Sequence, residues 1–482
     1  LLDSISISSN TTQGGAAGAG ASGAANGAAG SAFANDVFLF RGATLVFNGT
    51  GSLAASFAIQ SDQSASAGNI DGGITKQNSG TVTLSSTSNS YRGGTRINGG
   101  TLAISSDSNL GNSSGGVTFN GGALQVTSSF TSNRAVTMTG SGTVQVDGGV
   151  TFTSSGAIGS TGLLTKTGTG TLSLTGTNNY SGGTTISAGT ISIAAAGKMG
   201  TGTVTLNGGT LAATASFTDT NVFSIGSSGG TIDVATSATY TLSGGSGATS
   251  GALTKTGAGI LTLTAANGYT GGTTVNAGSV ALSGSGSLAS SGTVNLAASG
   301  ATFSISAISG GSTTIGNLSG VLGSVLTLGA KSLTLGDANS TSFAGSIGGS
   351  GGAIVKQGSG TLTLSTGTNS YSGGTTINAG TISVGSGGLL GTGSVTLNGG
   401  TLAATGTFTD SNNISLGASN GTINVSGSNV YTLSGAIGNA GAFTKTGSGT
   451  LSLTGGNNYA GGTTISAGTI SVAAAGKMGS GT

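Results

Sequence analysis

The 482-residue sequence lacks cysteine, proline, histidine and tryptophan, and all ten of its acidic residues are aspartate. Without His, Cys or Glu, the chain cannot assemble a Ser-His-Asp or Cys-His catalytic site or a Cys/His zinc site. The absence of proline suits strands in which every backbone N–H is hydrogen-bonded to a neighbour. We therefore predict a chain that is not an enzyme, with no catalytic residue and no residue that holds a cofactor or a metal.

Charge is also scarce, at 5% of residues, and the net charge of +2 is spread without a cluster. A nucleic-acid-binding protein shows a basic patch or stripe, so we expect no nucleic-acid partner. No run of about 18 apolar residues exists, which predicts no transmembrane helix in this chain. The 100 glycines follow no Gly-X-Y period and occur without proline, which excludes collagen. Low charge and positive mean hydropathy argue against a disordered chain.

What remains is an all-β fold built from short alternating runs. Thr171–Leu174 and Thr361–Leu364 alternate threonine or serine with leucine, the pattern of a strand with one buried face. Asn-Gly-Gly or Asn-Ala-Gly precedes many such runs, and both residue types tolerate the left-handed backbone that a tight turn requires. These turns contain Asn98, Asn120, Asn207, Asn276, Asn378 and Asn398.

A long internal repeat governs the chain. Residues 171–203 and 450–482 agree at 29 of 33 positions without a gap. Five copies each carry one tyrosine, at spacings of 89, 89, 102 and 88 residues, and a lysine lies 14 or 15 residues before each tyrosine. The tyrosines are Tyr91, Tyr180, Tyr269, Tyr371 and Tyr459, and the lysines are Lys76, Lys166, Lys255, Lys356 and Lys445.

A shorter period lies within the repeat. Predicted strands begin at Thr171, Thr190, Thr210, Thr231 and Ile260, in steps of 19, 20, 21 and 29 residues. Steps near 20 residues with short strands and glycine-rich bends are typical of a β-solenoid, whose coils stack about 4.8 Å apart. We predict a parallel β-helix with about 20 residues or slightly more per coil and four coils per 89-residue repeat, without a helix of any length in residues 71–482.

Two regions depart from this rhythm. Residues 14–32 contain only Gly, Ala, Ser and Asn and are expected to form a flexible loop. Strands are predicted at Val37–Phe40 and Leu45–Phe47, so residues 1–70 are interpreted as N-terminal solenoid coils and 71–482 as an array of five repeats, the last incomplete. Residues 260–361 are longer than the other repeats, with strands at Thr293, Thr313 and Ser332, and there we expect an additional coil or an outward loop.

The residues 165–186 and 444–465 share the motif Thr-Lys-Thr-Gly-x-Gly-Thr-Leu-x-Leu-Thr-Gly-x-Asn-x-Tyr-x-Gly-Gly-Thr-Thr-Ile. This motif resembles the passenger-associated β-strand repeat of bacterial autotransporters, and the resemblance extends over about residues 70–482. It implies a right-handed parallel β-helix that is exported through an outer-membrane barrel and displayed at the cell surface. The sequence departs from the motif at Arg92 and Arg96 in the first copy and at Ala265-Ala266 in the third.

These observations favour an extracellular structural or adhesive rod, the passenger region of a surface-displayed protein in adhesion or cell–cell and biofilm contact. The expected partners are cell-surface or matrix molecules or further copies of the chain, joined end to end or laterally. A self-associating filament or sheath protein is the alternative, because the ends of a solenoid are open templates for strand pairing. Ice-binding and polysaccharide-binding solenoids are further alternatives.

Few residues are candidates for chemistry. Asp219 and Asp233 are expected on neighbouring coils as the nearest approach to a carboxylate pair, against the alternative of solvated loop acids, and Asp410 corresponds to Asp219 in a later repeat. The repeated lysines and tyrosines could form a ligand row along one face. The alternative is that each tyrosine covers a turn while each lysine extends its amine into solvent from a strand edge.

The sequence also predicts that this chain is an excerpt from a longer array. Thr203 is followed by Val204–Leu211, which complete a coil, whereas the matching copy stops at Thr482. We expect the intact protein to continue with a similar strand and turn.

Overall fold

The computed structural model describes residues 5–8, 36–39, 43–61, 72–473 and 478–481. Residue contacts divide the chain into two units, which we describe separately. Unit 1 comprises Leu1–Thr205 and Gly209–Leu211, and unit 2 comprises Leu206–Gly208 and Ala212–Thr482. The predicted loop at residues 14–32, and Phe40 of the predicted strand after it, lie outside the described residues.

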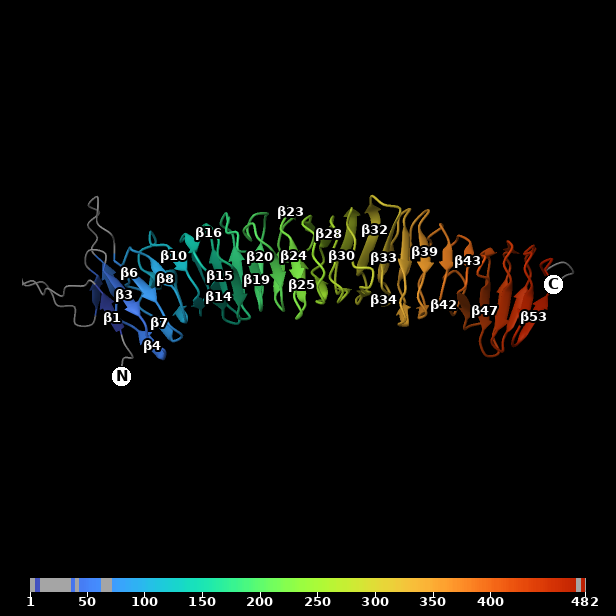
Figure 1. Ribbon diagram of the computed structural model, residues 1–482, viewed down its shortest axis with the longest axis horizontal. Helices are drawn as coiled ribbons and strands as arrows, with labels where there is room; N and C mark the ends of the chain where they lie inside the picture. Colours follow the sequence, from blue (N-terminus) through green and yellow to red (C-terminus); the bar gives the residue numbers. More distant parts are fainter. Residues whose placement is uncertain (1–4, 9–35, 40–42, 62–71, 474–477, 482) are drawn as a thin grey trace, which may run out of the picture. The chain divides into compact units, whose positions relative to one another are not determined.

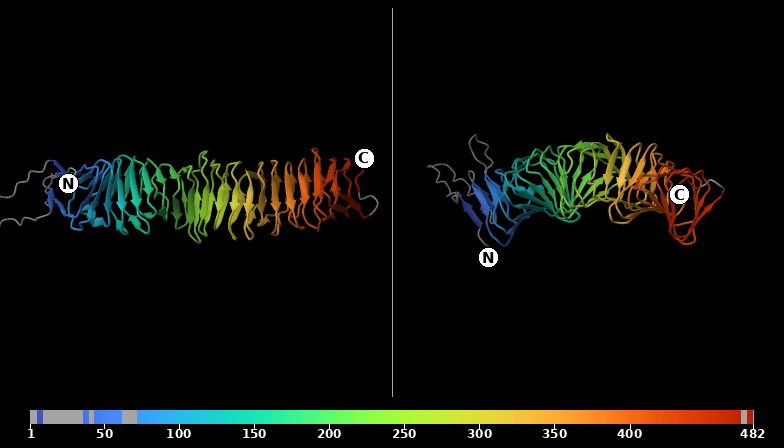
Figure 2. Two further views of the ribbon diagram at one scale, coloured as in Figure 1. Left: turned by 90° about the horizontal axis from the view of Figure 1, so that it is seen from below. Right: turned by 45° about the vertical axis from the view of Figure 1, so that its right-hand side comes forward.

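Each unit is a parallel β-solenoid whose chain passes through three ladders of short strands in turn (Figure 1). Within a ladder, each strand is hydrogen-bonded to the equivalent strands one coil earlier and one coil later, and the strands at the two ends of a ladder pair on one side only. Strands far apart in sequence therefore lie side by side (Figure 2). This arrangement confirms the predicted all-β fold class.

Unit 1 contains three principal ladders and one short pair. The first ladder consists of β1 (Ile5–Ser8), β3 (Thr44–Phe47), β6 (Gly73–Lys76), β8 (Thr95–Ile97), β10 (Val117–Phe119), β13 (Val136–Met138) and β16 (Ile158–Ser160). The second includes β4 (Ser52–Ala55), β7 (Thr81–Leu84), β9 (Thr101–Ile104), β11 (Ala123–Val126), β14 (Gly142–Val146), β17 (Leu164–Thr167) and β19 (Thr184–Ile186). The third includes β12 (Phe130–Ser132), β15 (Thr151–Ser154), β18 (Thr171–Leu174) and β20 (Thr190–Ile193). The pair is β2 (Val37–Leu39) with β5 (Ile59–Ser61).

Strands β21 (Val204–Leu206) and β22 (Thr210–Ala213) contain the residues at which the two units are divided. The longest ladder of unit 2 includes β25 (Gly230–Val234), β27 (Leu253–Thr256), β29 (Thr273–Val275), β31 (Val294–Leu296), β34 (Leu318–Gly320), β37 (Thr341–Phe343), β40 (Thr361–Leu364), β42 (Thr381–Val384), β44 (Thr401–Ala404), β47 (Gly421–Val425), β50 (Phe443–Thr446) and β52 (Thr463–Ile465).

Two further sets of strands complete unit 2. One set consists of β23 (Phe217–Asp219), β26 (Thr239–Leu242), β28 (Ile260–Leu263), β30 (Ser279–Gly284), β32 (Thr302–Ile308), β35 (Val325–Thr327) and β38 (Ser346–Gly348), with a separate ladder of β45 (Phe408–Asp410), β48 (Val430–Leu433), β51 (Thr450–Leu453) and β53 (Thr469–Val472). The other consists of β33 (Ser312–Ile315), β36 (Ser332–Leu335), β39 (Ala353–Lys356), β41 (Thr375–Ile377), β43 (Val395–Leu397), β46 (Ile414–Leu416) and β49 (Ile437–Gly438), and β24 (Phe223–Ile225) is a further strand.

The register gives the length of a coil directly. Thr151 pairs with Thr171, and Thr171 pairs with Thr190, so these two coils contain 20 and 19 residues. The coils of this chain contain about 21 residues on average. Apolar residues point into the coil and polar ones point outward, as the alternation predicts. Leu172, Leu174, Ile186 and Ile191 are all at most 1% exposed. Among the described pairs, β1 runs antiparallel to β3, which differs from the parallel arrangement elsewhere in this ladder.

The prediction of four whole coils per repeat is wrong. In unit 1, Lys76 lies on β6 in the first ladder, whereas Lys166 lies on β17 in the second. If a whole number of coils separated the two lysines, β17 would belong to the same ladder as β6. At about 21 residues per coil, 89 residues extend beyond four coils, so equivalent residues of successive repeats lie on different faces.

Three smaller expectations are also corrected. Ile260 lies on β28, which is not in the ladder of Thr231, since Thr231 pairs with Thr254. The longer repeat gains less than a whole coil of strands: eleven (β28–β38) separate β27 from β39, against nine or ten between the other successive lysine strands. A single turn of 3₁₀ helix, η1 (Asp107–Leu110), interrupts unit 1.

The strands predicted near Val37 and Leu45 correspond to β2 and β3. The division of the chain at residue 70 stays a prediction. Within the described ranges, the structure has no helix long and apolar enough to cross a membrane.

The stacked interior predicts a regional response to truncation. Leu172 pairs with Phe152 and Ile191 on the adjoining coils, so Leu172→Ala is expected to cost about 2–5 kcal/mol of local stability. Contacts extend only to neighbouring coils, so hydrogen exchange should accelerate in β15, β18 and β20 and change little in distant coils. Ser173→Ala, on the outward face of the same strand, is the matched control. Equal effects of the two substitutions, or uniform loss of protection along the chain, would contradict this interpretation.

Candidate functional site

The five repeated lysines point into the coils and are at most 1% exposed. Each amine donates hydrogen bonds to backbone carbonyl oxygens in the turn that follows its own strand. Lys166 Nζ lies 2.7 Å from the carbonyl oxygens of Thr167 and Gly168, and 3.2 Å from that of Ala188 one coil later. The amine therefore ties together the turns of two adjacent coils. Lys76, Lys255 and Lys445 make the same three-oxygen contact, with small changes in distance.

Glycine is required where these turns approach the amine. Gly189 has a φ of +62°, and a Cβ there would lie 2.8 Å from Lys166 Nζ. The same position is Gly100 beside Lys76 and Gly468 beside Lys445. In the turn that directly follows each lysine strand, Gly168 has a φ of +68°, and the first repeat uses Asn78 at +55° instead. In the turns predicted from the sequence, the left-handed role is confirmed for glycine, as at Gly100 (φ +58°) and Gly208 (φ +104°), whereas none of the six predicted asparagines has a positive φ.

Burial lowers the pKa of all five lysines, because a charged amine is less stable away from water. The pKa of Lys166 and that of Lys255 fall to about 8 from 10.5. Both sequence-based interpretations of the lysines are therefore wrong. The amines neither extend into solvent from a strand edge nor form a ligand row, since they are buried and the lysine strands change ladder within each unit.

The repeated tyrosines are buried as well, at 0–3% exposed. In each repeat the hydroxyl bonds the threonine four residues later, as Tyr180 does with Thr184 at 2.6 Å. Thr184 Oγ1 in turn donates to the carbonyl of Met199 one coil ahead, so the tyrosine hydroxyl is the donor to Thr184. Burial raises the pKa of Tyr180 above its usual range. The tyrosines fill the interior and lie against a turn of the next coil, where a Cβ at Gly200 (φ +69°) would lie 3.0 Å from the Tyr180 ring.

An asparagine two residues before the tyrosine links three coils, and the sequence analysis missed it. Asn178 Oδ1 accepts from the backbone N–H of Ile158 at 2.8 Å, one coil earlier. Its Nδ2 donates to the carbonyl of Lys198 at 2.6 Å, one coil later. Asn369 repeats both contacts, with Ile347 and Leu389. The shared Asn-x-Tyr spacing was visible in the sequence, but the partners about 20 residues away were not.

The two candidate acids do not come together. Asp219 lies on the inward face of β23 and is 2% exposed, whereas Asp233 lies on the outward face of β25 and accepts from Thr256 Oγ1. Asp219 accepts from Tyr240 Oη and from the N–H of Asn221, both at 3.2 Å. Burial raises the pKa of Asp219. Asp410 has the same environment with Tyr431 and Asn412, so neither acid is the solvated loop residue of the alternative interpretation.

Arg134 is a buried charge that the sequence analysis did not single out. Its Nε lies 2.9 Å from Asp107 Oδ1, and Nη2 donates to the carbonyls of Asp107 and Gly111 at 3.0 and 2.7 Å. These bonds hold the η1 turn, which explains why a helical turn persists there. An alignment of the repeats could have singled out Arg134. Phe-Thr-Ser-Asn-Arg at 130–134 aligns with Phe-Thr-Asp-Thr-Asn at 217–221, so the arginine stands where the later repeat has Asn221.

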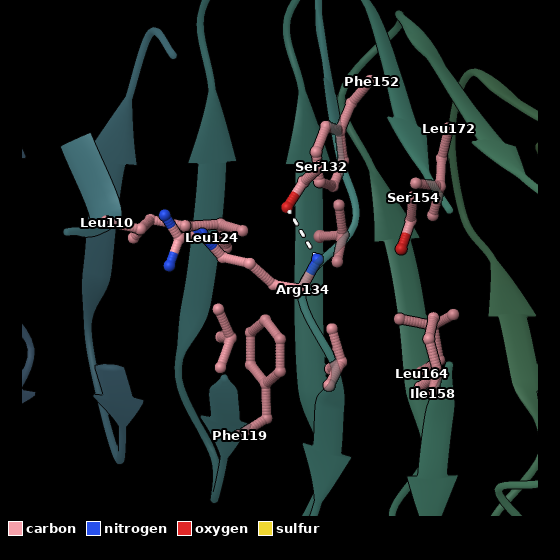
Figure 3. A pocket seen from close by; sticks show the side chains of 13 residues that line it. Leu110, Phe119, Leu124, Ser132, Arg134, Phe152, Ser154, Ile158, Leu164 and Leu172 are labelled. Carbon is pink, nitrogen blue, oxygen red and sulfur yellow. Dashed lines mark hydrogen bonds between the residues drawn. The ribbon is translucent and has the colours of Figure 1, made fainter. Parts of the chain in front are cut away.

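A small cavity lies beside Arg134 in the interior of unit 1 (Figure 3). Its volume is about 20 Å³, and its lining includes Phe119, Ser132, Phe152 and Ser154. This volume is close to that of a single water molecule, so this cavity has no room for a ligand. Within the described residues no group of three His, Cys, Asp or Glu side chains could hold a metal ion.

The buried lysines predict a specific pH dependence. Between about pH 8 and 10.5 the unfolded chain retains the Lys166 proton that the folded chain has lost, so the free energy of unfolding should rise with pH. At pH 7 Lys166→Met should cost roughly 1–3 kcal/mol by leaving carbonyls without a donor. Denaturant titrations at several pH values should show the stability difference between wild type and variant growing above pH 8. Lys198→Met, at a half-exposed lysine that bonds one carbonyl, is the control; a difference that stays constant with pH would contradict the prediction.

The cavity predicts a stabilising substitution. Ser154 occupies the position that Leu242 and Leu433 occupy in the aligned strands of unit 2. Ser154→Leu should fill the cavity and raise the free energy of unfolding by about 0.5–2 kcal/mol, measured by denaturant titration. Ser154→Ala serves as the size control and should have a smaller effect. A loss of stability in the leucine variant would show that the space is already packed.

Comparisons with known proteins agree with this repeat geometry. The family profile described as Passenger-associated-transport-repeat matches residues 74–104, 164–193, 253–282, 354–384 and 443–472. Each match contains the buried lysine, the asparagine and the tyrosine described above. No solved structure matches the chain.

The chain is also similar to a curated protein, the Adhesin BmaC autotransporter of Brucella suis biovar 1 (strain 1330). The two are 39% identical over 185 residues, which cover 36% of this chain and 5% of that protein. The chain thus carries five passenger-associated transport repeats, which confirms the predicted resemblance to autotransporter passengers with repeats of this kind.

Proposed function

We propose that this chain is part of a surface-exposed autotransporter passenger and has a structural and adhesive role without enzymatic activity. The observation that carries the proposal is its similarity to an autotransporter adhesin, together with the five passenger repeats. The expected location is the bacterial cell surface, and the expected partners are cell-surface or matrix molecules.

The distribution of chemistry within the fold supports this role. All five repeat lysines and all five repeat tyrosines are buried and bonded to backbone or threonine groups, with Lys356 donating to two carbonyls. Reactive groups are therefore used for packing, while small polar side chains cover the outward faces of the strands. Such a surface suits contact with large partners over several coils better than the turnover of a small substrate.

Attachment of cells that carry the intact protein tests the proposal. Deletion of the coding region for residues 72–473 is expected to lower attachment to host cells or matrix-coated surfaces, and the purified chain should compete with wild-type cells. Antibodies against the chain should label intact cells, which checks surface exposure, and an unrelated surface protein provides the labelling control. Unchanged attachment together with unlabelled cells would contradict the proposal.

A further inference from the structure

A polar hollow lies on the outer face of the first ladder of unit 1. It has a volume of about 280 Å³ and crosses the strands β3, β6, β8 and β10. Its floor is the backbone of Gly73, Gly94 and Gly116, one glycine from each of three successive coils. Thr75, Arg96 and Thr118 are paired in register along one side of it. At about 4.8 Å per coil, the glycine floor is roughly 10 Å long.

The hollow belongs to the first repeat because side chains fill the equivalent positions elsewhere. The carbonyl of Gly116 accepts a hydrogen bond from the N–H of Thr95, the threonine four residues after the repeat tyrosine. In three later repeats the N–H of the equivalent threonine donates to a residue with a side chain, namely Thr203, Thr293 or Ser394. Gly73 precedes the first inward residue of the lysine strand, and its counterparts are Leu163, Ala252, Ala353 and Ala442. Two side chains are thus missing from the outer face at this one place.

The same repeat carries two arginines where the other four are neutral. Arg96 replaces threonine at Thr185, Thr274, Thr376 and Thr464, and Arg92 replaces Ser181, Thr270, Ser372 and Ala460. Arg96 is exposed and lines the hollow. Arg92 lies in the turn that leads into Gly93 and Gly94, and its Nε is buried without a hydrogen-bond partner in the described part of the chain. None of the described residues that line the hollow is acidic.

We propose that this hollow binds an anionic sugar unit of an acidic polysaccharide. A guanidinium group presents a fork of donors that matches a carboxylate or a sulfate. The hydroxyls of Thr75 and Thr118 and the open glycine backbone supply partners for sugar hydroxyl groups. The volume is just below the range of about 300–1,000 Å³ for enclosed ligand pockets, which suits one unit of a longer chain held at the surface.

Other polymers fit this place less well. A peptide cannot add a strand here, because β6 pairs with β3 and β8, and β8 pairs with β6 and β10. Single-stranded nucleic acid uses aromatic side chains for base stacking, and no aromatic side chain is among the described residues that line the hollow. An acidic sugar needs only the hydroxyl, backbone and guanidinium groups that are present.

Binding of defined polymers to the purified chain tests this inference, which rests on the proposed adhesive function. The probes are dextran sulfate for sulfated sugars, hyaluronate for carboxylated sugars and neutral dextran. The chain should bind at least one of the two anionic polymers and not neutral dextran. Arg92→Ser with Arg96→Thr, the residues that other repeats carry, should weaken binding at least tenfold.

Two further variants separate the hollow from general charge attraction. Gly116→Thr keeps both arginines and fills the hollow as Thr203 does in the second repeat, and it should weaken binding at least fivefold. The space for this side chain is tight, since a Cβ at Gly116 would lie 3.0 Å from the carbonyl oxygen of Ala135, so circular dichroism and thermal unfolding must match wild type. Lys198→Thr with Lys331→Thr removes the same charge elsewhere and should leave binding within twofold.

Three outcomes would overturn the inference: no binding of either anionic polymer, no effect of Gly116→Thr, or an equal loss in the lysine control. A preference between sulfate and carboxylate identifies the acidic group and supports the site in either case. Failure here is distinct from failure of the adhesive function. Attachment of cells without polymer binding removes only the inference, and polymer binding without attachment removes only the adhesive function.

Discussion

Hydrogen bonding from coil to coil is the constraint on which the rest of the structure depends. A short strand of three or four residues has no stability of its own, and here it is held by equivalent strands of the neighbouring coils. The turns face a harder problem, because their carbonyl groups converge without a ladder partner. The buried lysine and asparagine of the repeat donate to these carbonyls and connect one coil with the next, and so does the threonine to which the tyrosine donates.

The lysine shows how strongly this demand acts. Burial of an amine is costly, and the lowered pKa of Lys166 and Lys255 reflects that cost. The position is tolerable because the surrounding carbonyl oxygens replace water as acceptors. The buried amine also requires glycine in the adjoining turn, because a side chain there would collide with the amine. The motif that identifies the repeat family is thus explained by the packing of turns.

The residues that all five repeats share are used for packing, and other residues differ between the repeats. Glycines 73 and 116 and the two arginines of the first repeat leave the interior pattern intact and alter only the outer face. The buried Arg134 and the Asp219–Tyr240 pair change the interior instead, and each keeps its charge or polar group bonded. A solenoid can accept such outer changes because each coil contacts only its neighbours.

The sequence by itself determined the fold class, the five repeats and the coil length near 20 residues. These follow from period-2 alternation, from glycine and asparagine at the turns, and from the identity of the copies, which are all local signals. It did not determine where Lys166, Tyr180 or Asp219 would lie. Lysine and aspartate are normally exposed residue types, and Tyr180 lies between β18 and β19, where alternation gives no direction. Only the tertiary structure placed them inside, because their hydrogen-bond partners come together only in the stacked coils. These partners are backbone carbonyls for Lys166, Thr184 Oγ1 for Tyr180, and Tyr240 Oη with the N–H of Asn221 for Asp219. The ladder change between successive lysine strands was also beyond sequence reasoning, because it depends on coil length summed over a whole repeat.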